Sequence, residues 1–334
     1  MNPRNPSMGT PMTHQPRSTV LPLTSVPMTG FKSFLNAPVQ TDLASLQADV
    51  AVLGIPYAIP YEMGQSRSAS APAYIREKSS RLARATIPHV GFDRAKTPGD
   101  LSQIRIVDCG DVPFDPLDIR GGVNRATEAV KAILNRGAVP VVFGGDDAVP
   151  IPVVRAYENH GPLVVIQIDE HMDWMTDRNG VTEGYSSPMR RIAEMPWVKQ
   201  TIQIGLHSFG AADQYKDALT AGSILITEQE VHLKGVPAIL DMIPAGENYF
   251  ITVDMDGFET TFMPAVSHPE PGGLTFRESV DLLCGLAARG HIVGMDWVEF
   301  VPDHDLNGLG GHSVGRLIAN LLQSMVDAGR LRKR

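Results

Sequence analysis

Four apolar segments of this sequence, at 139–145, 163–168, 249–253 and 291–300, run into or end in carboxylic acids. Apolar segments of this length are typical of buried strands, and a buried strand that ends in adjacent carboxylates needs something to neutralise them. The chemically active residues that the four segments carry are Asp146, Asp147, Asp169, His171, Asp173, Asp254, Asp256 and Glu299.

The spacing within these groups predicts a metal centre. Side chains two residues apart in an extended segment point to the same side, so Asp169, His171 and Asp173 face one way. Carboxylates gathered in one cleft would repel one another and take up protons unless cations lie between them. Oxygen-rich sites with some imidazole suit manganese and related metals, and two ions about 3.5–4 Å apart would use this many ligands. We expect Asp147 to be a ligand and Asp146 to shape the turn.

The elements that must position these groups alternate along the chain. Several strand-like segments are apolar throughout, which indicates burial on both faces, and helical periods that end at glycine lie between them. This alternation predicts a three-layer α/β/α sandwich with a mostly parallel sheet, in which ligands gather at the carboxyl ends of the strands. The expected strands are 49–55, 104–110, 139–145, 163–169, 201–207, 223–227, 249–254 and 291–300, and the clearest helices are 125–137, 276–290 and 312–325.

Composition excludes several classes of protein. The 334 residues carry a net charge of −8 and no basic run before the C-terminus, which argues against nucleic acid or a membrane surface as partner. No apolar run reaches about 18 residues, so we expect no transmembrane helix. The two cysteines and the lack of a signal peptide favour the cytoplasm. Residues 1–30 are predicted to be a flexible arm, and 31–334 a single domain.

The motifs resemble those of the ureohydrolases, the family of arginases, agmatinases, guanidinobutyrases and formiminoglutamases. The resemblance covers nearly all of the chain after about residue 30, and its specific segments are VVFGGDD, IDEHMDW, ITVDMDGFE and GMDWVEFVP. Within the family the agmatinase-like branch is the most similar, from TGFKSFLNAP, QIGLHSFG and GYSSPMRR. The resemblance implies the ureohydrolase fold and two manganese or nickel ions per subunit.

Carried over residue by residue, the resemblance implies two overlapping ligand sets. One metal would be held by Asp147, Asp169, Asp173 and Asp254, and the other by His171, Asp169, Asp254 and Asp256. Asp169 and Asp254 would bridge the two ions, and Glu299 would face the guanidinium of the substrate.

The sequence also departs from the family pattern. Asp147 stands where a histidine ligand is usual, and Glu170 where a small residue is usual. The segment GFETTF replaces the Asp-Pro that normally follows the Asp256 loop. The histidine expected near Ser187 and Pro188, a candidate proton shuttle, is absent. These departures predict an unusual substrate, another shuttle or weak activity.

Other residues are weaker candidates for the substrate pocket. Trp174 follows the proposed ligand Asp173 and would offer an aromatic face to a cation, although such residues are more often core. Ser187 lies in the segment where agmatinases place that histidine, and His268 follows the second metal loop. His207, as a lone histidine at a strand end, reads first as a structural residue.

These expectations converge on metal-assisted hydrolysis of a guanidine-type C–N bond that releases urea or a related product. Five aspartates against two dications leave the site negative, which favours a small cationic substrate. Asp256 would carry a proton to the leaving amine, and Glu299 would pair with the substrate. Guanidino acids, guanidine, alkylguanidines and biguanides all remain open as substrates.

Two alternatives remain. One is a non-catalytic or regulatory subunit of a hetero-oligomer, which the irregular segments would suit. The other is an arginase-fold deacetylase, which needs one zinc ion and fewer acidic ligands. We expect a homo- or hetero-oligomer, a trimer or a hexamer.

Overall fold

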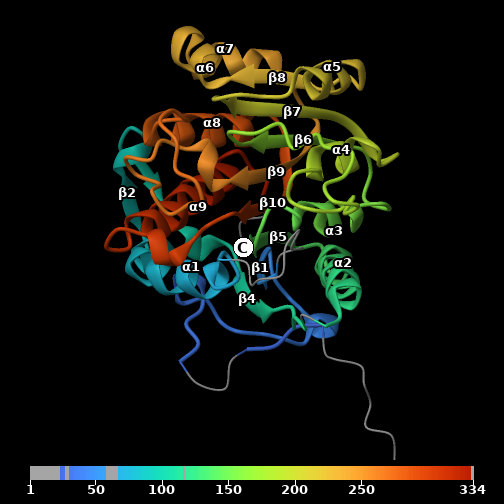
Figure 1. The fold of residues 1–334 in the computed structure, drawn as a ribbon. Coiled ribbons are helices and arrows are strands. Elements are labelled where there is room, and N and C mark those ends of the chain that lie inside the picture. The colour runs from blue at the N-terminus through green and yellow to red at the C-terminus, as the bar shows by residue number, and fades with distance from the viewer. Residues whose placement is uncertain (1–22, 27–29, 58–66, 116, 332–334) are drawn as a thin grey trace, which may run out of the picture.

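The computed structural model describes residues 23–26, 30–57, 67–115 and 117–331 (Figure 1). Its main feature is an eight-stranded sheet with the order β4-β1-β5-β10-β9-β6-β7-β8, in which every neighbouring pair is parallel. The strands are β1 (Val50–Ile55), β4 (Ile106–Asp111), β5 (Val139–Gly144), β6 (Leu163–Ile168), β7 (Val198–Leu206), β8 (Ile224–Thr227), β9 (Asn248–Asp254) and β10 (His291–Val298).

The sheet confirms the predicted strands. Each of the eight predicted segments forms one strand of it, with ends shifted by no more than a few residues. The strands at the centre of the sheet are buried along nearly their whole length, as continuous apolar runs require. A short antiparallel hairpin of β2 (His89–Gly91) and β3 (Thr97–Gly99) lies apart from the sheet.

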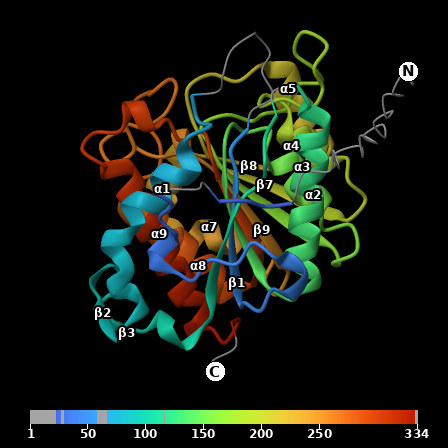
Figure 2. The ribbon, with the colours of Figure 1, turned by 90° about the horizontal axis from the view of Figure 1, so that it is seen from below.

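Helices cover both faces of the sheet and complete three layers (Figures 1 and 2). One face packs against α1 (Ala71–Ser79), α6 (Glu228–Lys234), α7 (Val236–Met242), α8 (Phe276–Arg289) and α9 (Leu309–Asp327). The other packs against α2 (Ile119–Asn135), α3 (Pro150–Arg155), α4 (Pro188–Ala193) and α5 (Ala212–Thr220). The three clearest predicted helices correspond to α2, α8 and α9, and the predicted α/β/α class is confirmed.

Short 3-10 helices fill several connections. They are η1 (Phe34–Asn36), η2 (Leu43–Ser45), η3 (Ser80–Thr86), η4 (Phe92–Arg94), η5 (Leu101–Gln103), η6 (Met255–Gly257) and η7 (Pro302–His304). The one that matters for the site is η6, which directly follows β9.

Most of the predicted N-terminal arm lies outside the described residues, so the division into an arm at 1–30 and a domain at 31–334 stays a prediction. In the part of the chain that the structure describes, no helix combines the length and apolarity needed to cross a membrane.

Candidate metal centre

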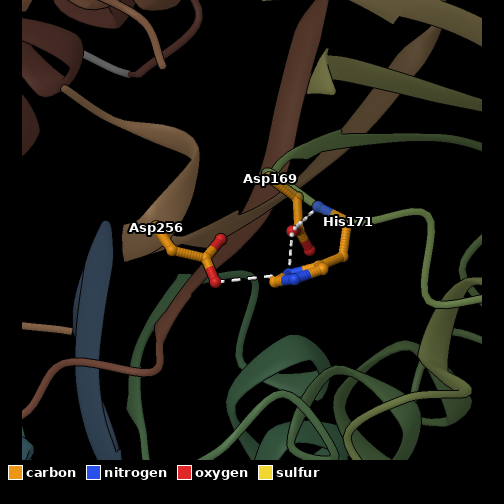
Figure 3. A group of neighbouring side chains, drawn as sticks. All are labelled: Asp169, His171 and Asp256. Carbon is orange, nitrogen blue, oxygen red and sulfur yellow. Dashed lines mark hydrogen bonds and ion pairs between the residues drawn. The ribbon is translucent and has the colours of Figure 1, made fainter. Parts of the chain in front are cut away.

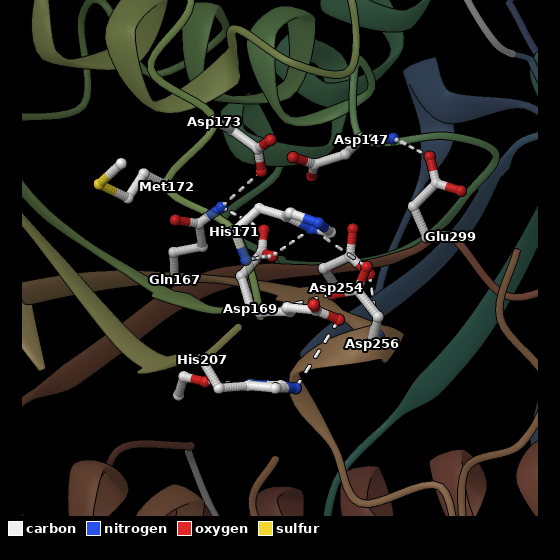
Figure 4. A network of polar contacts seen from close by, with 12 residues as sticks. Asp147, Gln167, Asp169, His171, Met172, Asp173, His207, Asp254, Asp256 and Glu299 are labelled. Atoms are coloured by element: carbon white, nitrogen blue, oxygen red, sulfur yellow. Dashed lines mark hydrogen bonds and ion pairs between the residues drawn. The ribbon is translucent and has the colours of Figure 1, made fainter. Parts of the chain in front are cut away.

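The sheet order brings the acidic groups together. The strands that carry them, β5, β10, β9 and β6, are direct neighbours at the centre of the sheet. Because all four are parallel, their carboxyl ends open on the same edge, and the acidic side chains converge there (Figure 4).

Two groups of possible metal ligands share Asp169. Donor atoms of Asp169, His171 and Asp256 all lie within 4.8 Å of one another, and so do those of Asp147, Asp169 and Asp173. Figure 3 shows the first group, in which Nδ1 of His171 lies 3.3 Å from Oδ2 of Asp256. A carboxylate that belongs to both groups is placed as a bridging ligand would be.

Asp254 belongs to neither of these compact groups, although it lies in the same cluster (Figure 4). One of its carboxylate oxygens accepts the backbone N–H of Asp256 at 3.0 Å, which shapes the turn at η6. Its charge contributes to the raised pKa of Asp147. The geometry therefore gives weaker support for Asp254 as the second bridging ligand than for Asp169.

Asp147, Asp169 and Asp254 are buried, whereas Asp173 and Asp256 are half-buried and His171 is exposed. Burial, followed by the charges of neighbouring carboxylates, raises the pKa values of Asp147, Asp169 and Asp254 well above the ordinary aspartate range. Hydrogen bonding to Asp256 raises the pKa of His171 to about 10. Burial works in the opposite direction on Asp256, but the His171 ring outweighs it and lowers that pKa.

The donor set fits divalent cations. Oδ2 of Asp147 is buried and has no hydrogen-bond partner among the described residues, which is costly for a carboxylate unless a ligand binds it. Carboxylate oxygens with one imidazole match hard or borderline cations. The predicted role of Asp146 in the turn also agrees with the structure, because its carboxylate accepts the backbone N–H of Ala148 at 3.0 Å.

Glu299 lies at the end of β10 in a left-handed backbone conformation, with φ of 59°. Such a conformation is uncommon outside glycine and often marks a functional position. Its Oε1 accepts the backbone N–H of Asp147 at 3.0 Å, and its own backbone N–H donates to the carbonyl of Gly145 at 2.8 Å. Burial raises the pKa of Glu299 to about 7.

Gly145 makes this junction possible. A Cβ added there would lie 1.9 Å from the carbonyl oxygen of Tyr57, so only glycine lets β5 end this close to the chain after β1. The same turn presents Asp147 beside Glu299.

Two glutamines that the sequence analysis did not consider hold metal ligands in position through hydrogen bonds. Nε2 of Gln167, on β6, donates to the carboxylates of Asp169 and, at 3.2 Å, Asp173. Gln203, its neighbour on β7, donates to the side-chain oxygen of Gln167 and to the Met172 carbonyl. Both glutamines are buried. The available signal was Gln167, a polar residue inside the otherwise apolar strand β6.

Replacing Gln167 by leucine should weaken metal binding while the fold is kept. The change removes the hydrogen bonds that orient two ligands, and loss of such support typically costs about 10–100-fold in metal affinity. Isothermal titration calorimetry with the metal ion measures the affinity of each variant. Thr201→Val is the matched control, since Thr201 is a buried polar residue of β7 that contacts Ser223 and not the ligands. Equal losses in both variants would mean that Gln167 has no specific role.

The weaker sequence candidates do not meet in the site. Trp174 is 2% exposed, because its indole N–H donates to Asp217 and the ring packs in the core. Ser187 is fully buried at the start of α4, and its hydroxyl has no hydrogen-bond partner among the described residues. His268 is exposed. The structure therefore does not place Trp174, Ser187 or His268 on the cavity beside the ligands, whose described lining includes Ser186 instead.

Glu170 belongs to neither ligand group, as predicted, but the predicted extended segment is wrong: β6 ends at Ile168, and Asp173 has a left-handed φ of 45°. Instead of crowding a helix, the buried carboxylate of Glu170 lies 3.7 Å from Nε2 of His207. Nδ1 of His207 lies 2.8 Å from the carbonyl oxygen of Gly205, and a carbonyl only accepts, so that nitrogen carries a proton. His207 is thus held on one side by the backbone and faces an acid on the other.

Comparisons with known proteins identify the family of this chain. A sequence model of the arginase family matches residues 48–326. Guanidinopropionase of Pseudomonas aeruginosa is 32% identical over 294 residues, which cover 84% of this chain and 86% of that protein. Mitochondrial agmatinase of Gallus gallus is 27% identical over 307 residues, 89% of this chain and 85% of that protein.

Comparison with solved structures finds the same fold. The solved structure of proclavaminate amidino hydrolase from Streptomyces clavuligerus superposes with a TM-score of 0.78 at 26% identity, covering 90% of this chain and 98% of that chain. The family match extends over most of the sequence and includes every strand of the sheet. This chain belongs to the arginase family, as its motifs predict.

Proposed function

We propose that this protein binds two divalent metal ions and hydrolyses a guanidine-type C–N bond, with release of urea or a related product. The observation that carries the proposal is the Asp169 carboxylate, shared by two ligand groups in the same cluster as the half-buried acid Glu299. The names of similar proteins, guanidinopropionase and agmatinase among them, support a guanidino compound as substrate.

The proposed ligands divide between two ions, manganese or nickel. Asp147, Asp169, Asp173 and Asp254 would hold one, and His171, Asp169, Asp254 and Asp256 the other. When bound, the two ions would supply Lewis-acid polarisation and water activated near neutral pH. Both ions would also cancel the repulsion that raises the pKa values of the buried carboxyls.

The side chains of the protein would bind and orient the substrate. Glu299 is half-buried and adds an acid to a negative site, so a planar cation that donates two N–H groups suits it better than a neutral molecule. The backbone N–H of Asp147 already occupies Oε1 of Glu299, which fixes the direction of the carboxylate. Asp256 is ionised in this structure, so it could accept the proton that the attacking water loses and then pass it to the leaving amine.

The test is to count metal ions per purified chain and to measure urea release from a panel of guanidines, with manganese and with nickel. The proposal expects two ions per chain and urea from at least one guanidine. One ion per chain would favour the deacetylase alternative, and no metal would favour a non-catalytic subunit. Two ions with no turnover of any guanidine would contradict the hydrolase function.

Glu299→Gln should lower the apparent affinity for a guanidine substrate about tenfold to hundredfold. The amide keeps the shape of the side chain but loses a charge-assisted contact worth about 1.5–3 kcal/mol. Metal content should not change, because Glu299 is not a proposed ligand. The test measures turnover against substrate concentration, together with metal content, for both proteins. Unaltered kinetics would remove Glu299 from the substrate site. Loss of metal would instead make Glu299 a metal ligand.

We also propose that the protein forms a homo- or hetero-oligomer, a trimer or a hexamer, and acts in the cytoplasm. Light scattering after size-exclusion chromatography tests the assembly. A monomer at working concentrations would contradict it.

A further inference from the structure

Glu170 lies between two proposed ligands, Asp169 and His171, and contacts a third. Its backbone N–H donates to Oδ1 of Asp256 at 3.2 Å. Asp169, His171 and Asp256 form one of the two compact ligand groups. A shift of the Glu170 peptide would therefore disturb every member of that group.

The segment that carries Glu170 is held at the end of β7. The N–H of Asp169 donates to the carbonyl of Ile204 at 3.1 Å, and the N–H of His207 donates to the carbonyl of Glu170 at 3.2 Å. Because β6 ends at Ile168, these two bonds lie beyond the regular strand. The segment thus depends on individual contacts, and the side chain of Glu170 makes one of them with His207.

The ring of His207 is held in one orientation. Its Nδ1 lies 2.8 Å from the carbonyl oxygen of Gly205. A Cβ added to Gly272, where φ is 124°, would lie 2.8 Å from Cδ2 of the ring, so only glycine leaves room for the imidazole. These contacts direct Nε2 toward the Glu170 carboxylate at 3.7 Å, which Figure 4 draws as a dashed line from His207. Nε2 makes no hydrogen bond with the described residues, so it has this acid as its polar neighbour.

A carboxylate at position 170 is costly without a partner. The side chains of Glu170 and His207 are only 4% and 6% exposed, and the acid Asp256 is close by. Loss of hydration and repulsion would drive the Glu170 side chain outward, and its peptide would move with it. The imidazole of His207 offsets part of this cost. Since Nε2 is buried, the pair is not placed to bind a substrate in the neighbouring cavity.

We propose that Glu170 and His207 form a positioning pair for the metal ion held by His171, Asp169, Asp254 and Asp256. Neither residue is a ligand. Their contact keeps the Glu170 peptide on Asp256 and so fixes the ligands on both sides of it. This inference rests on the proposed two-metal site and adds the residues that tune one of its ions.

The experiment titrates the metal-free protein with manganese chloride and follows each binding step by calorimetry. His171→Ala removes a ligand of this ion alone and so identifies the step to follow. Glu170→Ala and His207→Leu should each weaken that step by about 10-fold or more, the usual effect of losing a residue that orients a ligand. The other step should not change. Glu170→Gln, which keeps the size of the side chain, should weaken the same step alone.

The double variant of Glu170→Ala and His207→Leu separates a pair from two independent residues. If the two act through their mutual contact, the double variant should lose no more affinity than the more affected single variant. Additive losses overturn the pair. Equal losses at both binding steps, or no change in either variant of Glu170, overturn the positioning role.

His232→Leu is the matched control. His232 also faces an acid, Glu278 at 2.7 Å, but it lies on α6 and belongs to neither ligand group. Both binding steps should be unchanged, and a loss equal to that of His207→Leu would overturn the inference. Failure of the proposed function is distinguishable, because it shows in the wild-type protein as the absence of two binding steps, and the inference then falls with it.

Discussion

Asp169→Asn should abolish binding of both metal ions and lower turnover by about a thousandfold or more. Asp169 is the carboxylate that belongs to both ligand groups, so its loss weakens both sites at once. Losing metal-based stabilisation removes several kcal/mol of transition-state binding, which corresponds to a loss of that size. Metal analysis of the purified variant and urea release measure the effect, and circular dichroism checks the fold.

The matched control is Asp241→Asn, on the exposed face of α7. It should keep metal and activity. An Asp169→Asn protein that still holds two ions per chain would contradict the bridging role.

Metal binding should also release protons. Burial and neighbouring carboxylates raise the pKa values of Asp147, Asp169 and Asp254, so these groups retain protons in the metal-free protein at pH values where free aspartate has lost them. Metal must displace these protons, and apparent affinity should therefore fall as the pH falls. Calorimetry in buffers of different ionisation enthalpy counts the protons for the wild-type protein. A count of zero would contradict the proposed ligand set.

Arg76→Met should lower the free energy of unfolding by about 3–5 kcal/mol. Arg76 on α1 is fully buried and binds both carboxylate oxygens of Asp108, at 2.9 and 3.0 Å, and also Asp111. Methionine fills similar space but leaves a buried carboxylate without its cation, which is strongly destabilising. Urea denaturation measures the change.

The control for Arg76 is Arg84→Met, at an exposed position of η3 that follows α1 in the chain. It should change stability by less than about 0.5 kcal/mol. Adding Asp108→Asn to Arg76→Met should recover part of the loss, because the unpaired charge disappears. If Arg76→Met and Arg84→Met have the same effect, the buried ion pair does not hold α1 to β4.

Some features of the site followed from local sequence pattern, and others did not. Asp169 and Asp173 belong to the ligand groups and Glu170 does not, as predicted, but strand alternation is not the reason: β6 ends at Ile168, and Asp173 has a left-handed φ of 45°. The partner of Glu170 was not predictable, since His207 lies 37 positions further along the chain, on the neighbouring strand. Gln167 was overlooked for a similar reason: its role depends on contacts across strands, and its neighbours in sequence are apolar.

Trp174 shows that a residue next to a proposed ligand in the sequence can have its side chain in the core. Its position next to the proposed ligand Asp173 suggested the pocket, but its indole N–H donates to Asp217 on α5. Only the packing of α5 against this face of the sheet decides that the ring is core.

The sequence by itself determined the eight strands, the parallel α/β architecture and the edge of the sheet at which the acidic residues gather. These are consequences of local periodicity and of the handedness of the chain, which each segment carries on its own. The tertiary structure alone decided that β5, β10, β9 and β6 are neighbours, although β9 and β10 come late in the sequence. Strand order depends on how apolar faces pack over the whole domain, and no local pattern contains it. That order places Glu299 against Asp147 across 152 positions and makes Asp169 common to both ligand groups.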